Sequence, residues 1–134
     1  MEKNSTWRFW DCGIDLKHYT VQTMKQNING DVEFFISSCM NDAKYIISFN
    51  SVEFLSYKDE SNSARLFSDL IERYGRKFLS DSDFYVVEGS ELLDFWYKHE
   101  IVINSKEELT QYCFMSDEGV WDIITTDTPE IKKV

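Results

Sequence analysis

The chain has 134 residues, of which 43% are hydrophobic and 16% aromatic, with one proline and five glycines. This is the size of one domain, and the composition excludes a disordered or low-complexity chain; no apolar run approaches the ~20 residues of a membrane helix. The formal net charge of −10 disfavours nucleic acid and anionic membranes as partners and favours a basic protein or a cation.

The first half of the chain is predicted to be mainly β-structure. Residues 6–12 are dense in aromatics and fit a strand, whereas residues 15–28 match helix and strand patterns and stay undecided. After a turn signal at residues 29–31, β-branched and aromatic residues dominate three further runs, at 32–38, 43–49 and 52–57. Residues 39–42 suit a hairpin loop between the first two of these runs. We expect an antiparallel meander.

The clearest predicted helix begins after residue 62. Its apolar residues recur at three- and four-residue steps: Leu66, Phe67, Leu70, Ile71, Tyr74 and Phe78. Gly75 lies near the end of this stripe, and we expect it to contribute to helix termination.

The remaining segments predict one more helix between strands. Residues 84–88 fit a short strand, and Ser90 is a natural N-cap for a helix that turns Leu92, Leu93 and Trp96 inward. Residues 109–115 and 120–125 flank a Ser-Asp-Glu-Gly turn and predict a hairpin, which ends at Thr128-Pro129. The full pattern predicts a single α+β domain over residues 1–134, with an antiparallel β-sheet and two main helices packed on one face.

No catalytic or metal-binding motif is apparent. The sequence has no Gly-x-Ser-x-Gly nucleophile elbow and no Gly-rich phosphate loop. Two histidines and three scattered cysteines do not make a zinc site, and no calcium loop is present, so we expect no metal and no cofactor. His99 is the best lone candidate for acid–base chemistry, although a helix C-terminus favours histidine by its dipole alone.

Cellular location follows from two features. Cys12, Cys39 and Cys113 stand far apart and are odd in number, so we expect reduced thiols. The first residues lead into Trp7 and not into an apolar h-region, so no secretory signal is visible. We expect a cytoplasmic protein.

The acidic residues are concentrated in the second half of the chain. Residues 1–80 hold eleven acids and ten bases, whereas residues 81–130 hold thirteen acids and two lysines. Aromatic residues interleave these acids, and we expect Trp96 to be in the core and Tyr97 to be more exposed. Aromatics among carboxylates form an anchor and a steering field for a basic partner. The candidate partner-binding residues are Asp81, Asp83, Glu88, Glu91, Asp94, Tyr97, Asp117, Glu118, Trp121 and Asp122.

The segments between about residues 50 and 130 follow one another in a recognisable order. The run Ser51–Glu60 precedes the amphipathic helix, the run Phe84–Trp96 follows it, and the run Tyr112–Thr125 leads to Pro129. This order resembles small bacterial immunity proteins, which partner polymorphic or contact-dependent growth inhibition toxins. The resemblance implies a non-catalytic cytoplasmic protein that binds a toxin domain and blocks it. Many such toxins are nucleases with basic surfaces.

The leading hypothesis is therefore a non-catalytic immunity protein that neutralises a basic toxin domain through an acidic surface, and we expect that toxin to be a nuclease. One alternative is a phage- or plasmid-encoded acidic DNA mimic that inhibits a host nuclease. Another is a small acid–base enzyme that uses His99. A toxin gene directly upstream favours the first hypothesis, phage genes nearby favour the second, and a deep pocket with an acid beside His99 favours the third.

Overall fold

The computed structural model describes residues 5–59, 63–100, 104–116 and 118–134. These residues form nine strands, three α-helices and a short 3₁₀ helix, η2. The strands are β1 (Thr6–Phe9), β2 (Tyr19–Gln26), β3 (Val32–Ser38), β4 (Lys44–Phe49), β5 (Val52–Asp59), β6 (Phe84–Glu88), β7 (Thr110–Ser116), β8 (Gly119–Thr125) and β9 (Glu130–Lys133). The helices are α1 (Ala64–Tyr74), α2 (Arg76–Asp81), α3 (Glu91–His99) and η2 (Lys106–Glu108).

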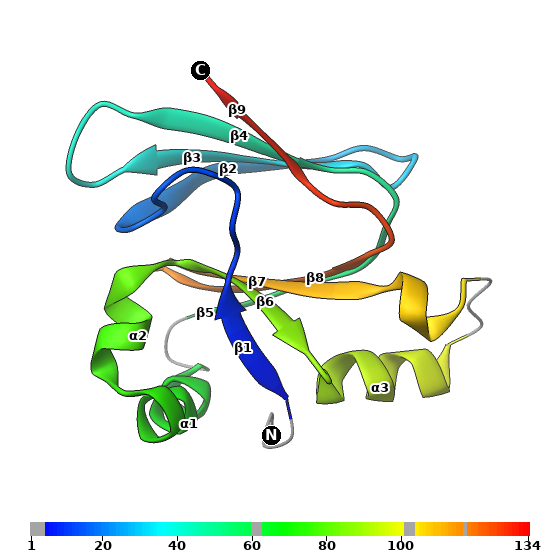
Figure 1. Ribbon diagram of the computed structural model, residues 1–134. Helices are drawn as coiled ribbons and strands as arrows, with labels where there is room; N and C mark the ends of the chain where they lie inside the picture. Colours follow the sequence, from blue (N-terminus) through cyan, green and yellow to red (C-terminus); the bar gives the residue numbers. More distant parts are fainter. Residues whose placement is uncertain (1–4, 60–62, 101–103, 117) are drawn as a thin grey trace.

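The elements stack in three layers (Figure 1). A four-stranded sheet of order β2-β3-β4-β9 packs on one face of a five-stranded sheet of order β1-β6-β7-β8-β5, and α1, α2 and α3 lie on the other face. All strand pairs are antiparallel. The predicted α+β class with helices on one face is confirmed, and the strands divide into two sheets instead of one.

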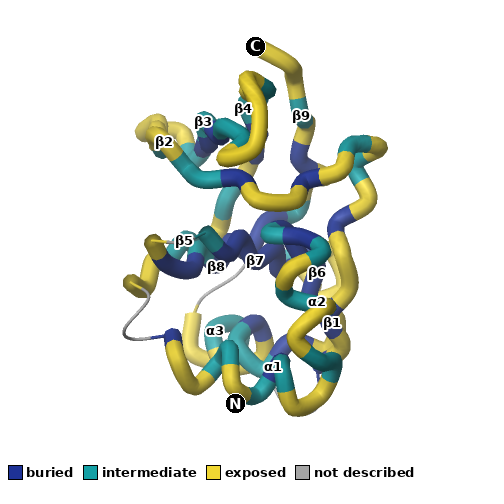
Figure 2. The backbone as a smooth tube through the Cα atoms, turned by 90° about the vertical axis from the view of Figure 1, so that its left-hand side faces the viewer, coloured by how far each residue is buried: buried dark blue, intermediate teal, exposed yellow. Residues whose placement is uncertain are grey.

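The middle layer is buried on both faces because it has a neighbour on each side. Phe114 of β7 contacts the four-stranded sheet, where its ring centroid lies 5.3 Å from that of Phe34. The next residue along the strand in each direction points the other way, and Cys113 and Met115 pack with Leu70 of α1. Figure 2 shows these buried stretches of β6, β7 and β8 between the other two layers.

The predicted meander ends one strand early. β2, β3 and β4 pair in sequence, but β5 leaves them and pairs with β8 in the other sheet. The corner between β4 and β5 contains Ser51 at φ 55°, and the Thr125 hydroxyl donates to the carbonyls of Asn50 and Ser51 at 2.8 and 3.1 Å. These contacts join residues more than 70 positions apart, so no local pattern could reveal the crossover.

Three other segments refine the predicted elements. The undecided segment 15–28 contains strand β2, and strand β9 follows Pro129, where no strand was predicted. The predicted helix stripe divides at Gly75, whose φ of 89° and ψ of 163° end α1 before α2 begins. Within the described segments, no helix has both the length and the hydrophobicity needed to cross a membrane.

Candidate functional site

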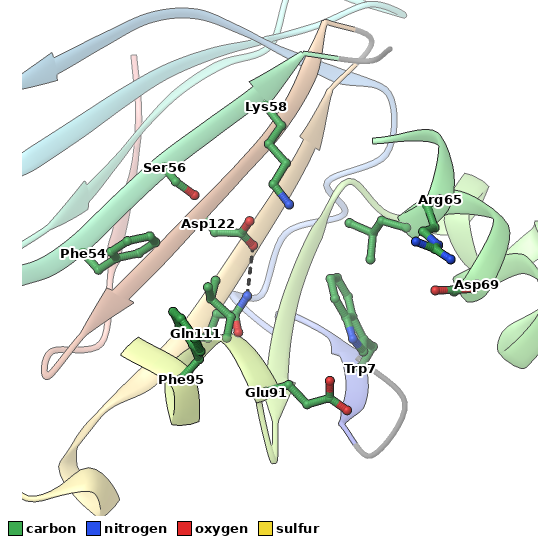
Figure 3. Close-up of a pocket in the computed structure, with 12 residues that line it drawn as sticks. Trp7, Phe54, Ser56, Lys58, Arg65, Asp69, Glu91, Phe95, Gln111 and Asp122 are labelled. Atoms are coloured by element: carbon green, nitrogen blue, oxygen red, sulfur yellow. Dashed lines mark hydrogen bonds between the residues drawn. The ribbon is translucent and has the colours of Figure 1, made fainter. Parts of the chain in front are cut away.

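A cavity of about 710 Å³ opens between α1, α3 and the helix-covered face of the five-stranded sheet (Figure 3). This volume is typical of a ligand pocket. The residues that line it come from six elements: Trp7 of β1; Phe54, Ser56 and Lys58 of β5; Arg65, Leu66 and Asp69 of α1; Glu91, Leu92 and Phe95 of α3; Gln111 of β7; and Asp122 of β8.

The cavity exists because the helices cover the sheet in two separate places. One apolar cluster joins α1 and α2 to the sheet around Leu70 and Tyr85. Another joins α3 to the sheet around Leu93 and Ile124. Neither cluster fills the space between them, and the polar side chains of Gln111 and Asp122 in the middle strands line this space.

A chain of hydrogen bonds forms the floor of the cavity. The Ser90 hydroxyl caps α3 by accepting from the Leu93 N–H at 2.9 Å, and it donates to Oε1 of Gln111. Gln111 Nε2 in turn donates to Oδ1 of Asp122 at 2.9 Å. Gln111 and Asp122 are only 1% and 6% exposed, so these bonds replace the water that both side chains lose. The Asp122 carboxylate is therefore held in one position.

The acidic residues that line the cavity are more buried than the basic ones. Asp122 is buried and Glu91 is half-buried, while Lys58 and Arg65 are exposed. Oδ2 of Asp69 is buried and has no hydrogen-bond partner among the described residues. The described lining contains three acids and two bases, with the most buried charge being negative.

The end of the molecule beside the cavity is strongly acidic. Residues 88–108 contain six acids and two lysines. We call this region the acidic end, and its exposed acids are Glu88, Asp94, Glu100, Glu107 and Glu108. Figure 1 shows α3 and η2 together at this end.

Few of these charges are neutralised by contacts in the described structure. Glu88 pairs with Arg8 at 2.7 Å, and Asp94 pairs with Lys106; all four side chains are about half exposed or more. Hydrogen bonds from the Ser105 backbone and hydroxyl hold the pKa of Glu108 below its usual value, which keeps this acid charged.

An exposed aromatic residue stands between the acidic end and the cavity. Phe95 is 64% exposed, lines the cavity, and stacks on His99 with 4.3 Å between ring centroids. Sequence reasoning missed Phe95, although the signal was present. Because Leu92, Leu93 and Trp96 occupy the inward side of α3, the helical period places Phe95 on the outward side.

Three other predicted acids lie at the opposite end of the five-stranded sheet. Asp81 pairs with Lys77 at 2.7 Å and with Lys17 at 3.9 Å, and Asp83 accepts from the Tyr19 N–H at 2.6 Å. Glu118 is exposed in the turn between β7 and β8. Asp117, which was also predicted, lies outside the described residues. The structure thus brings Glu88, Glu91 and Asp94 together and separates them from Asp81, Asp83 and Glu118.

The predicted aromatic residues do not line the cavity. Tyr97 is half-buried, as is Trp96, and its hydroxyl donates to the Asn104 carbonyl at 3.1 Å. Trp121 is half-buried on the other face of the sheet, with its ring centroid 5.4 Å from that of Phe34. Strand alternation therefore places Trp121 and Asp122 on opposite faces, although both were predicted for one site.

The remaining reactive groups are separate from the cavity. His99 is exposed, with Nδ1 2.8 Å from the Phe95 carbonyl oxygen, and it does not line the cavity. Cys12, Cys39 and Cys113 are not joined in disulfide bonds, and burial raises the pKa of Cys12. In the described part of the chain, no three His, Cys, Asp or Glu residues are grouped as metal ligands.

Comparison of the chain with protein-family models, with curated proteins and with solved structures gave no match.

Proposed function

We propose that this protein is a non-catalytic inhibitor that binds a basic protein, as an immunity protein binds a toxin domain. The binding surface is the acidic end together with the adjoining cavity. The observation that carries the proposal is Phe95, an exposed aromatic residue that lies between exposed carboxylates and the cavity. Exposed aromatics of this kind are frequent anchors of protein interfaces.

The charge of the acidic end suits a partner that carries many lysines and arginines. Complementary potentials raise the rate at which two proteins meet, and they disfavour partners of like charge. A nuclease grips phosphates with basic side chains, so a toxin of that class has the required surface. The ion pairs of Glu88 and Asp94 are exposed, and such pairs are worth at most about 1 kcal/mol, so a partner can replace them.

An interface of ordinary size would cover this region. Such interfaces bury about 1,600 Å² in total, with a few central residues supplying most of the binding energy. In the proposed complex, Phe95 takes the central position, and the exposed acids of α3 and η2 contribute to the polar rim.

The test starts with the protein encoded directly upstream of this gene. The proposal predicts that it is basic, that it forms a stoichiometric complex with this chain, and that the rate constant of association falls steeply as salt is added. An upstream product that is acidic, or that does not bind, contradicts the proposal.

Charge reversal then locates the surface. The double variant Glu88→Lys/Asp94→Lys should slow association by about tenfold at low salt and change the dissociation rate less. The matched control is Asp15→Lys/Asp42→Lys, which changes the net charge equally at exposed positions outside the acidic end. Stopped-flow fluorescence measures both rates. Equal slowing by the two variants would show that total charge acts and that the acidic end does not.

A further inference from the structure

We infer that the cavity between α1 and α3 is a receptor for one arginine side chain of the basic partner, with the guanidinium directed at Asp122. The inference rests on the proposed function and specifies what the cavity does in it.

The arrangement of acceptors suits a guanidinium. This group is planar and always charged, and its five N–H donors point in fixed directions. The acids of the cavity come from three elements that surround one space: Asp122 from the sheet, Asp69 from α1 and Glu91 from α3 (Figure 3). Oδ2 of Asp69 is buried without a hydrogen-bond partner in the described structure, so a donor that enters the cavity would satisfy it.

The apolar part of the lining suits the rest of an arginine side chain. Trp7, Phe54 and Phe95 line the cavity, and guanidinium is weakly hydrated and stacks on aromatic faces. Leu66 and Leu92 offer apolar surface to the methylene stem. A volume of about 710 Å³ holds the side chain with space for ordered water.

The floor is organised before any ligand arrives. Ser90 fixes the amide of Gln111, and this amide fixes one oxygen of Asp122. Little ordering is then required on binding, which favours affinity. Lys58 and Arg65 are exposed, so solvent and salt screen them more than the buried Asp122. The cavity therefore favours a cation at its floor.

The test uses n-butylguanidinium, a mimic of the arginine side chain, followed by the indole N–H signal of Trp7 in ¹H–¹⁵N NMR spectra. Of the four tryptophans, Trp7 alone lines the cavity, so the signals of Trp10, Trp96 and Trp121 serve as internal references. We expect a saturable shift of the Trp7 signal and weaker binding of n-butylammonium, which lacks the planar fork.

Two variants test the role of the floor. Asp122→Asn keeps an oxygen for Gln111 Nε2 but removes the charge, and it should weaken binding of the probe at least tenfold. Asp42→Asn makes the same chemical change at an exposed position in the loop at 39–42, outside the acidic end and the cavity, and should leave binding unchanged. Ser56→Leu fills the cavity without changing charge and should also abolish binding, so it serves if Asp122→Asn fails to fold.

The outcomes separate this inference from the proposed function. If the probe leaves Trp7 unchanged, or if Asp122→Asn and Asp42→Asn weaken binding equally, the cavity is not a guanidinium receptor. If the partner binds Asp122→Asn and Ser56→Leu as tightly as the original protein, the inference fails and the proposed function stands. If the probe binds but the partner does not, the proposed function fails while the guanidinium specificity of the cavity remains.

Discussion

Gln111 and Asp122 are polar side chains inside strands that are otherwise buried and mainly apolar. Burying a carboxylate is costly unless hydrogen bonds replace its water, and apolar residues of similar volume are often at least as stable in such positions. Here Ser90 and Gln111 supply hydrogen bonds that lead to Asp122. The buried charge is thus fixed beside an open cavity, which is where a binding role would require it.

Ser90 both caps α3 and takes part in the hydrogen bonds at the floor of the cavity. Replacing it in Ser90→Ala removes the cap of α3 and leaves Oε1 of Gln111 without its hydroxyl donor. We expect the free energy of unfolding to fall by about 2–3 kcal/mol. Urea denaturation measures this loss. Ser80→Ala, at an exposed position of α2, is the control and should change stability by less than about 0.5 kcal/mol. Similar losses in the two variants would contradict the role of Ser90.

Asp81 makes the stability of the protein depend on pH. A hydrogen bond from Lys77 lowers the pKa of Asp81 below its usual 3.8. A carboxyl group with a lowered pKa stabilises the folded state above the unfolded pKa, and this contribution is lost as the pH falls through the folded pKa. Lys77→Gln should therefore lower the melting temperature at pH 6, and the difference should shrink below pH 3.8. Calorimetry against pH checks this, with Lys98→Gln as an exposed control. A difference that is constant with pH would exclude the pair as its cause.

The candidate site was only partly predictable at this scale. The sequence identifies acids such as Glu91 and Asp122, but it does not show that these two, 31 positions apart, line one cavity. It also does not show that Asp83 is engaged with the backbone of Tyr19. Phe95 follows from the helical period once α3 is accepted, whereas the burial of Oδ2 of Asp69 depends on the tertiary packing around α1.

At the scale of elements, the sequence patterns correctly predicted the features that depend on contacts between residues close together in the chain. The hairpin β7–β8, the loop at 39–42 and the Ser90 cap all depend on residues near one another in sequence. Strand β9 and the crossover to β5 depend on partners far away, namely β4 and β8. The segment 15–28 was undecided because its own pattern is mixed, and pairing with β3 makes most of it a strand.

Gly75 separates α1 from α2 and so sets how α1 meets the sheet. Its φ of 89° and ψ of 163° fall in a region that only glycine adopts readily. Gly75→Ala should lower the free energy of unfolding by about 1–3 kcal/mol, measured by urea denaturation. Ser68→Ala, at an exposed position within α1, is the control and should be neutral or slightly stabilising. An unchanged stability in Gly75→Ala would mean that the helix break tolerates other backbone conformations.

At the scale of the whole molecule, the apolar contacts are distributed unequally between the three layers. The two sheets share the largest apolar cluster, so stability resides mainly between them. The helix layer adds two smaller clusters and leaves the cavity between them. In the proposed complex, a partner on the helix side would contact side chains of the middle sheet without disturbing the interface between the sheets.

Charge also differs between the helix side and the four-stranded sheet. The acidic end contains α3 and η2, whereas Lys44, Lys132 and Lys133 lie on strands of the four-stranded sheet. This distribution would attract a basic partner to the helix side of the molecule near α3 more than to the far sheet. In the proposed complex, the cavity beside α3 receives one of the partner's side chains.

Mapping the contact surface by NMR tests this account most directly. The ¹⁵N-labelled protein is titrated with the purified product of the upstream gene, and each backbone and indole signal is followed. The account predicts that the signals of α3, η2 and the Trp7 indole change, while those of the turn at 29–31 and the loop at 39–42 do not. Changes confined to the four-stranded sheet, with α3 and Trp7 unaffected, would contradict it.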